Sequence, residues 1–301
     1  MRLTKTLLTA LLFGSAVNCA QAAFVGPASA YNAFVFGNFT SANSDTEGNL
    51  AAGGDVNLQN YSVASSISGS SARLVAGGTV TATNGGVGDG QNGTIYAGGA
   101  TNLNSFTARG GVQSQKLVDF TAAESQYQRL STSWGALAAN GSTSVESGSL
   151  TLNGTDSSLS IFSVDGNDLT GTNSVFINAA SGSTVLINIT GSGQIFQNGQ
   201  VTLAGVDAAH VIYNFSDATT LTLDGSKNPF GTVFAPFADV TGGNGALDGQ
   251  LIAKSFDGNI ELHDVSFEGN LPTAVPLPAA AWLFGSALGM IGGIARKRRS
   301  S

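Results

Sequence analysis

A glycine-containing motif recurs three times in the first third of the chain. Segments 49–56, 73–80 and 94–101 each place an apolar residue, any residue and Ala-Gly-Gly before a return to strand-forming residues. The Ala-Gly-Gly units follow one another at spacings of 24 and 21 residues. A period of about 20 residues with one glycine corner per turn is typical of stacked β-solenoid coils. We expect these glycines to adopt positive φ at the corners and to let neighbouring coils approach closely.

Short apolar runs bounded by Gly, Asn, Asp and Ser continue through the rest of the chain and indicate strands. Three of them, near Val211, Val233 and Leu251, recur at spacings of 22 and 18 residues. Neither a proline-rich nor a charged linker interrupts the body. We therefore predict one mainly β domain over residues 23–271, a right-handed β-solenoid, followed by a short linker at 272–274.

One segment, residues 115–139, has a helical pattern instead. It contains no glycine before Gly135, and its apolar residues fall at helical spacing. Phe120, Tyr127 and Trp134 are seven residues apart and form one apolar stripe. Asn140-Gly141 is a suitable terminator. We predict a long helix that packs its stripe against the solenoid, with a ligand-binding stripe as the alternative.

The N-terminus has the features of a secretory signal peptide. Arg2 and Lys5 precede an apolar segment from Leu7 to Val17, and small residues suit signal peptidase cleavage between residues 22 and 23. The predicted site consists of Ala20, Ala22 and Ala23. Lipidation at Cys19 is disfavoured, because Asn18 precedes it and the usual Leu three positions upstream is missing. Cleavage would remove this single cysteine, so the mature chain would contain no disulfide or thiolate metal site.

The C-terminus combines a proline signature, an apolar run and a basic cluster. The signature is Val275, Pro276, Leu277, Pro278 and Ala279. The run at 280–295 is roughly 24 Å long as a helix, slightly short for a hydrocarbon core of about 30 Å. Trp282 and the cluster Arg296, Lys297, Arg298 and Arg299 can extend the span by snorkelling. The cluster should remain cytoplasmic, which predicts that the body lies outside the inner membrane.

The tail resembles the PEP-CTERM class of bacterial sorting signals, in the variant with the VPLPA signature. The resemblance implies that an exosortase cuts near the signature and releases the protein from the inner membrane to the cell surface of a Gram-negative-type bacterium. A permanent single-span anchor that is never cut is the alternative.

The body resembles the choice-of-anchor A family of secreted bacterial proteins. The matching segments are 31–39, 47–56, 118–120, 231–236 and 249–253. This resemblance implies an adhesive surface or matrix protein and does not imply a reaction. The plan of solenoid plus helix is also similar to that of ice-binding adhesin domains.

Charge restricts the class of partner. After removal of both predicted end segments, six cations and all 19 acidic residues remain, a net charge of −13. Such a body is not expected to bind nucleic acid or anionic membrane surfaces.

We predict no catalytic, cofactor or metal site. His210 and His263 lie in apparent strands, and the adjacent Asp264 should point to the opposite face from His263. The sequence contains no nucleophile elbow, phosphate loop or paired-histidine zinc motif. The nearest carboxylate pairs, Asp165 with Asp168 and Asp257 with Glu261, suit turns and strand edges better than glycoside cleavage.

Three ligands remain open alternatives to a purely structural role. Calcium is one alternative because the glycine-rich segments 85–90 and 242–249 are similar to β-roll turns, but each stands alone. Ice binding would need repeated threonine rows, and only Thr79, Thr81 and Thr83, or Thr220 and Thr222, form them. Polysaccharide binding would use exposed aromatic residues, for which the candidates are Tyr61, Tyr96, Phe106 and Tyr213.

We predict a non-enzymatic structural or adhesive protein of the cell surface or biofilm matrix, with exopolysaccharide as its expected partner.

Overall fold

The computed structural model describes residues 21–23, 26–191, 195–196, 199–224 and 228–272. The predicted sorting signature, apolar run and basic cluster lie outside these residues, as does the signal peptide up to residue 20. Within the described ranges, no helix is long and apolar enough to cross a membrane. Residues 22–274 form one compact unit, which is the domain.

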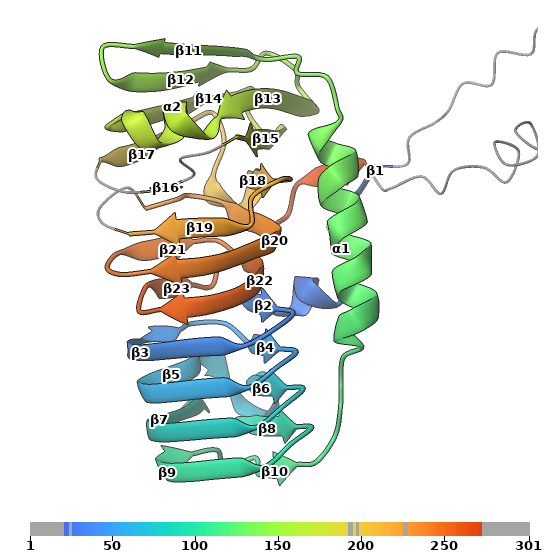
Figure 1. Cartoon of the computed structure of the whole chain (residues 1–301), viewed down its shortest axis with the longest axis vertical. Helices are drawn as coiled ribbons and strands as arrows, with labels where there is room; N and C mark the ends of the chain where they lie inside the picture. The colour runs from blue at the N-terminus through green and yellow to red at the C-terminus, as the bar shows by residue number, and fades with distance from the viewer. Residues whose placement is uncertain (1–20, 24–25, 192–194, 197–198, 225–227, 273–301) are drawn as a thin grey trace, which may run out of the picture. The chain divides into compact units, whose positions relative to one another are not determined.

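The domain is mainly β, as predicted, and consists of coils stacked into a column with one long helix along its side (Figure 1). The sheet under this helix is parallel, because every neighbouring pair of its strands runs in the same direction. In spatial order its strands are β10 (Val112–Gln113), β8 (Thr94–Ala97), β6 (Arg73–Ala76), β4 (Leu50–Ala52), β2 (Ala33–Val35), β22 (Leu251–Gly258), β20 (Thr232–Gly242), β18 (Val211–Phe215), β15 (Thr184–Thr190) and β13 (Leu159–Asp165).

A second parallel ladder forms another side of the column, and we call its outer surface the polar face. Its strands are β16 (Ile195–Phe196), β19 (Thr220–Leu223), the later parts of β20 and β22, β3 (Phe39–Thr46), β5 (Val56–Ser68), β7 (Val80–Asp89) and β9 (Thr101–Thr107). Buried apolar residues from the ladders fill the column and make its core continuous.

The remaining elements complete the coils. β21 (Ala246–Asp248) pairs with β23 (Glu261–His263), which continues to the end of β3. A four-stranded sheet contains β11 (Ser142–Glu146), β12 (Ser149–Asn153), β14 (Ser174–Asn178) and β17 (Gln200–Ala204). The short segments are β1 (Gln21–Ala23), which pairs with β24 (Asn270–Pro272), α2 (Gly166–Gly171), η1 (Pro27–Ala30), η2 (Gly69–Ser71) and η3 (Ala208–His210).

The coils are not stacked in chain order. The chain starts in the middle of the column at β2 and descends through β4, β6 and β8 to β10. The long helix α1 (Phe120–Gly135) then returns along the side to the other end, from which β13, β15, β18 and β20 lead back (Figure 1). β22 finally pairs with β2. We call the junction where the first and last coils meet the seam.

The Ala-Gly-Gly glycines serve one of the two purposes predicted for them. A Cβ on Gly77 would overlap the carbonyl oxygen of Gly53, and one on Gly98 would overlap that of Gly77, so close stacking is confirmed. The prediction of positive φ is wrong, because these glycines are not among the residues with positive φ. Their N–H groups stay in the ladder: Gly77 donates to the carbonyl of Ala52 at 2.8 Å.

α1 begins at Phe120 and ends at Gly135, so it is shorter than the predicted 115–139. Its start is fixed by Asp119, whose carboxylate accepts a hydrogen bond from the N–H of Ala122 at 3.0 Å. Leu117 therefore precedes the helix, and its side chain is 37% exposed. Helical spacing alone did not distinguish the extended segment before the cap from the helix.

The predicted aromatic stripe of α1 packs against the sheet, so the core-packing interpretation is confirmed. The Phe120 ring lies 5.3 Å from that of Phe34 on β2, measured between centroids. Tyr127 and Trp134 lie 5.9 and 5.1 Å from Phe234 on β20. The stripe is thus occupied by its own sheet on both sides of the seam.

Buried polar groups fix the second half of α1 on the sheet. The hydroxyl of Ser131 donates to the Asn214 side-chain oxygen at 2.6 Å, and the Asn214 amide donates to the Ser131 carbonyl and to Asn188. Asn188 in turn donates to the Trp134 carbonyl at 2.7 Å. Since these groups are shielded from water, their geometry selects one position of the helix.

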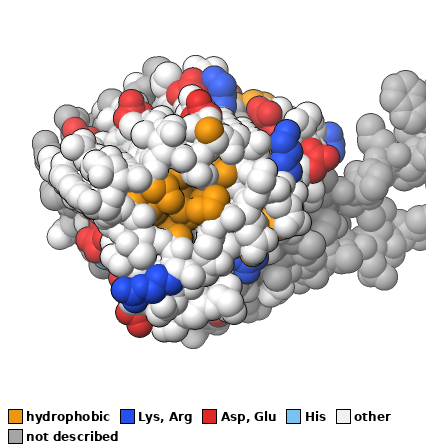
Figure 2. Space-filling model, turned by 90° about the horizontal axis from the view of Figure 1, so that it is seen from below, with side chains coloured by type: hydrophobic (Ala, Val, Ile, Leu, Met, Phe, Trp, Pro, Cys, Tyr) orange, Lys and Arg blue, Asp and Glu red, His pale blue; other side chains and the backbone are white. Residues whose placement is uncertain are grey.

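The lower end of the column exposes part of its apolar interior. Seen from below, apolar side chains gather at the centre of this end within a polar surround (Figure 2). Leu103 on β9 is 36% exposed and Val112 on β10 is 46% exposed. These strands close the last coil before the chain turns toward α1.

Candidate functional site

The polar face carries a continuous row of hydrogen-bonding side chains. Successive residues of a strand point to opposite sides, so one residue per strand contributes to each outward row. The first row, in spatial order, is Thr222, Thr241, Asp257, Thr40, Asn57, Thr81 and Asn102. Adjacent strands lie about 4.8 Å apart, so the row spans roughly 29 Å.

A second row runs beside the first over the N-terminal half of the column. It consists of Ala42, Gln59, Thr83 and Asn104. At its edge Asn43, Asn60 and Asn84 each adopt positive φ, between 51° and 55°, a conformation that asparagine tolerates better than most residues. The Asn60 amide donates to Asn43 at 2.8 Å, and the Asn84 amide donates to Asn60 at 3.1 Å. This ladder holds the edge of the polar face in a fixed geometry.

The threonines identified in the sequence occupy this face only in part. Thr81 and Thr83 lie in the first and second rows, and Thr222 lies in the first row. Thr79 instead belongs to the corner before β7, where its N–H donates to the Asp55 carboxylate at 2.7 Å. Asn57 and Asp257 stand between the threonines, so threonine does not repeat from coil to coil. The sequence predicts this lack of repetition.

The aromatic residues proposed for carbohydrate binding do not form a surface, and that prediction is wrong. Tyr61, Phe106 and Tyr213 are buried, and Tyr96 is half-buried against the α1 side of the sheet. Among the described residues, every aromatic side chain is buried or half-buried. Burial raises the pKa of Tyr61 and of Tyr213 well above the ordinary value for a phenol. The strand pattern predicted aromatic positions but did not indicate which way they point.

The carboxylates considered for catalysis or calcium are distributed over a helix end and several strands. Asp165 caps α2 by accepting from the N–H of Asn167 at 2.8 Å, with Asp168 in the first turn of that helix. Asp257 lies in the polar face, whereas Glu261 belongs to the β21–β23 ladder. In the glycine-rich segments, Asp89 accepts from Ser68, and Asp248 contacts His263.

The two histidines have different surroundings. His210 Nδ1 lies 2.6 Å from an Asp207 carboxylate oxygen. His263 Nδ1 lies 2.8 Å from Asp248, and its Nε2 lies 3.5 Å from Glu261. Burial lowers the pKa of His263, but the hydrogen bond that its ring donates to Asp248 and the nearby carboxylates outweigh this effect, so the pKa is raised overall. Sequence reasoning considered only Asp264 and missed Glu261, which stands two positions before His263 on the same side of the strand.

Of the residues predicted for processing, Ala22 and Ala23 lie in β1. Ala20, the sorting signature and the terminal basic cluster lie outside the described residues, so those predictions are unchanged.

One family model matches most of the chain. Residues 24–264 match the model of the ice-binding-like adhesive domain family. One solved structure that resembles this chain is an ice-binding protein from an Antarctic biological consortium, with 14% identity, a TM-score of 0.35, and coverage of 87% of this chain and 93% of that one. Another is the ice-binding protein of the Antarctic ascomycete Antarctomyces psychrotrophicus, with 14% identity, a TM-score of 0.32, and coverage of 79% and 96%. No curated protein matches the chain.

Proposed function

Because the chain belongs to the family of ice-binding-like adhesive domains, we propose that it is a non-enzymatic adhesive protein of the cell surface or extracellular matrix. We propose that it adheres through its polar face and that its ligand is exopolysaccharide. The observation that carries this proposal is the first row, in which each of seven adjacent strands contributes a hydroxyl, amide or carboxylate.

The geometry of the row suits an extended polymer better than a small molecule. A small ligand is usually bound in a concave, mostly apolar pocket, whereas this face is a ladder of parallel strands with outward polar groups. Hydroxyl and amide side chains can pair with the hydroxyls of successive sugar units. Each such hydrogen bond contributes only about 0.5–1.5 kcal/mol net, so useful affinity requires many of them in register.

Binding to the host's exopolysaccharide tests this proposal. Thr81 lies in the exposed centre of the N-terminal half of the row, and Thr81→Ile removes its hydroxyl and places a bulkier, strand-compatible and non-aromatic side chain there. We expect a loss of affinity of roughly tenfold or more, as for other central interface positions. Ser144→Ile on β11, exposed and away from the polar face, is the matched control. Equal binding by both variants would place adhesion elsewhere.

Ice is the second candidate ligand, favoured by the family and by the threonines of the row. Asp257 argues for the polysaccharide, because a strongly hydrated carboxylate interrupts the row. Inhibition of ice recrystallisation by the native protein, lost in Thr81→Ile and kept in Ser144→Ile, would favour ice.

We further propose that the chain is exported by its signal peptide and then sorted by an exosortase. The order of signature, apolar run and basic cluster supports this proposal. Intact mass of the protein from its own host should give a chain from about residue 23 to 275–279 in the surface fraction. Replacing Pro276 and Pro278 by Ala should leave it membrane-retained at full tail length. Unchanged release of that variant would contradict sorting by cleavage.

A further inference from the structure

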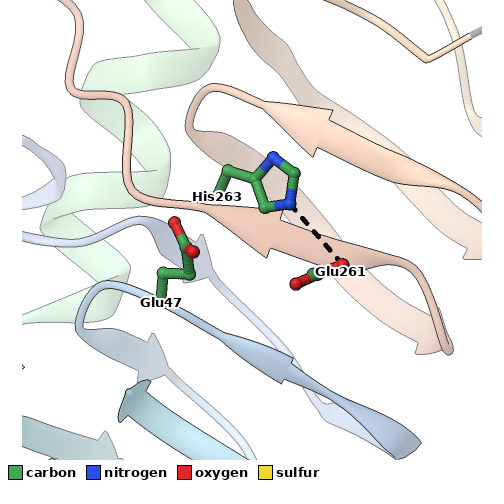
Figure 3. Close-up of side chains that lie close together, drawn as sticks. All are labelled: Glu47, Glu261 and His263. Atoms are coloured by element: carbon green, nitrogen blue, oxygen red, sulfur yellow. Dashed lines mark ion pairs between the residues drawn. The ribbon is translucent and has the colours of Figure 1, made fainter. Parts of the chain in front are cut away.

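Three potential metal ligands converge beside the seam. Glu47 directly follows β3 in the first half of the chain, whereas Glu261 and His263 lie on β23 in the last coil (Figure 3). One carboxylate oxygen of each glutamate and a ring nitrogen of His263 all lie within 4.8 Å of one another. The folded chain therefore brings together ligands that are far apart in the sequence.

The histidine and Glu47 are oriented by further contacts. The 2.8 Å contact between Nδ1 of His263 and Asp248 leaves Nε2 as the nitrogen that faces Glu261. When one ring nitrogen of a histidine binds a metal, the other usually donates to a carboxylate. That hydrogen bond fixes the tautomer and makes the metal-binding nitrogen a stronger ligand. Glu47 is held by the N–H of Asp264, which donates to its carboxylate at 2.9 Å.

The separation of His263 and Glu261 fits an ion between them. Nε2 of His263 lies 3.5 Å from the nearest oxygen of Glu261. Zinc bonds to nitrogen and oxygen are about 2.0–2.1 Å, so two ligands of a tetrahedral site stand roughly 3.4 Å apart. Three carboxylates, those of Glu47, Asp248 and Glu261, also lie near this one imidazole. A divalent cation would balance that excess of negative charge.

We propose that Glu47, Glu261 and His263 bind a first-row divalent transition metal, with Zn²⁺ as the best-suited ion. The imidazole ligand favours this class over Ca²⁺ and Mg²⁺, which prefer all-oxygen sites. The side chains of His263 and Glu261 are 31% and 48% exposed, so an ion can enter from solvent, and water can complete the coordination. The ion would link the first and last coils across the seam. This site is separate from the polar face.

Titration of the full chain with ZnSO₄ after treatment with a chelator tests the proposal by calorimetry. We expect one Zn²⁺ per chain, and Glu261→Gln and His263→Gln should each weaken binding roughly tenfold or more. Asp248→Asn should weaken it about 10–100-fold, as for other residues behind a metal ligand. Ca²⁺ should neither bind nor compete. His210→Gln is the matched control, because His210 also pairs with an aspartate but stands outside the three-ligand group.

Two further measurements keep the result unambiguous. Co²⁺ bound at the site should give visible absorption bands that disappear in His263→Gln, and Zn²⁺ should raise the Tm of the native chain but not of that variant. Glu261 is half-exposed, so Glu261→Gln should fold even if Glu47→Gln does not. Absence of Zn²⁺ binding, or binding that survives His263→Gln and is lost in His210→Gln, would overturn the proposal and leave His263 as a purely structural ion-pair partner.

Discussion

Asn214 is the residue on which the docking of α1 depends most. Its side chain is fully buried and satisfies Ser131 and Asn188 together. Asn214→Ala would leave the Ser131 hydroxyl and the Asn188 side-chain oxygen without these partners, and each unsatisfied buried group costs about 1–3 kcal/mol. We expect a loss of roughly 2–4 kcal/mol in the free energy of unfolding, measured by urea denaturation.

Asn178→Ala is the control for this substitution, because Asn178 also donates to another asparagine, Asn153, but in an exposed ladder. It should cost under about 1 kcal/mol. Similar costs for the two substitutions would show that the buried network does not hold the helix.

Tyr127 makes the stability of the domain sensitive to alkaline pH. Burial raises its pKa from 10.0 to about 12, and its hydroxyl accepts from the N–H of Ala28. The pKa of Tyr127 is higher in the folded chain than in the unfolded one, so the protonated phenol stabilises the fold. This stabilisation is fully present below pH 10 and is lost as the pH rises toward 12. Each pKa unit corresponds to about 1.4 kcal/mol. Unfolding free energies measured across this window should fall for the native chain, and less steeply for Tyr127→Phe. Identical slopes would contradict the assignment.

Among the elements, the glycine corners determine how closely the coils stack. Gly77→Ala would place a methyl group against the Gly53 carbonyl oxygen, a backbone atom that cannot rotate away. Overpacking of this kind costs about 1–3 kcal/mol, and we expect at least that loss in urea denaturation. Gly171→Ala at the end of α2 meets nothing within 4 Å and should be neutral. A neutral Gly77→Ala would mean that the coils can separate without cost.

Elements were predictable from the sequence where a local period determines them. The spacing of Phe120, Tyr127 and Trp134 predicted both the helix and its buried side, because residues seven positions apart lie two turns apart on the same side of a helix. The start of the helix was not predicted, since it depends on one capping contact at Asp119. The polar face was missed for a similar reason: Thr40, Asn57 and Thr81 form a row only once the register between coils is known.

For the whole molecule, the order of the coils was beyond the reach of the sequence. The repeat predicts that coils stack but contains nothing that joins β22 to β2, since that pairing is between residues far apart in the chain. The cluster of Glu47, Glu261 and His263 depends on this junction. A search for local ligand spacing could find at most Glu261 with His263.

Asn32 joins the two halves of the molecule at the seam, and its removal tests whether they unfold together. Its amide donates to the carbonyls of Gly249 and His263 at 2.9 Å each, and its side-chain oxygen accepts from the N–H of Gly48. Because the apolar core continues across β2 and β22, we expect Asn32→Ala to cost roughly 2–4 kcal/mol. Hydrogen exchange should accelerate in β6 and in β18 by the same factor, since a single cooperative unit opens as a whole.

Asn140→Ala is the matched control for the seam, because Asn140 also bridges backbone groups, those of Leu159 and Ile161, but within the second half alone. Asn140→Ala should lower the free energy of unfolding by less than Asn32→Ala does, since the hydrogen bond donated by Asn140 is exposed. Any global opening that it promotes should again accelerate hydrogen exchange equally in both halves. Faster exchange confined to β6 in Asn32→Ala would instead show that the N-terminal coils open independently. In that case the seam would be a contact between two folding units, and a metal ion bound there would act as a clamp between them.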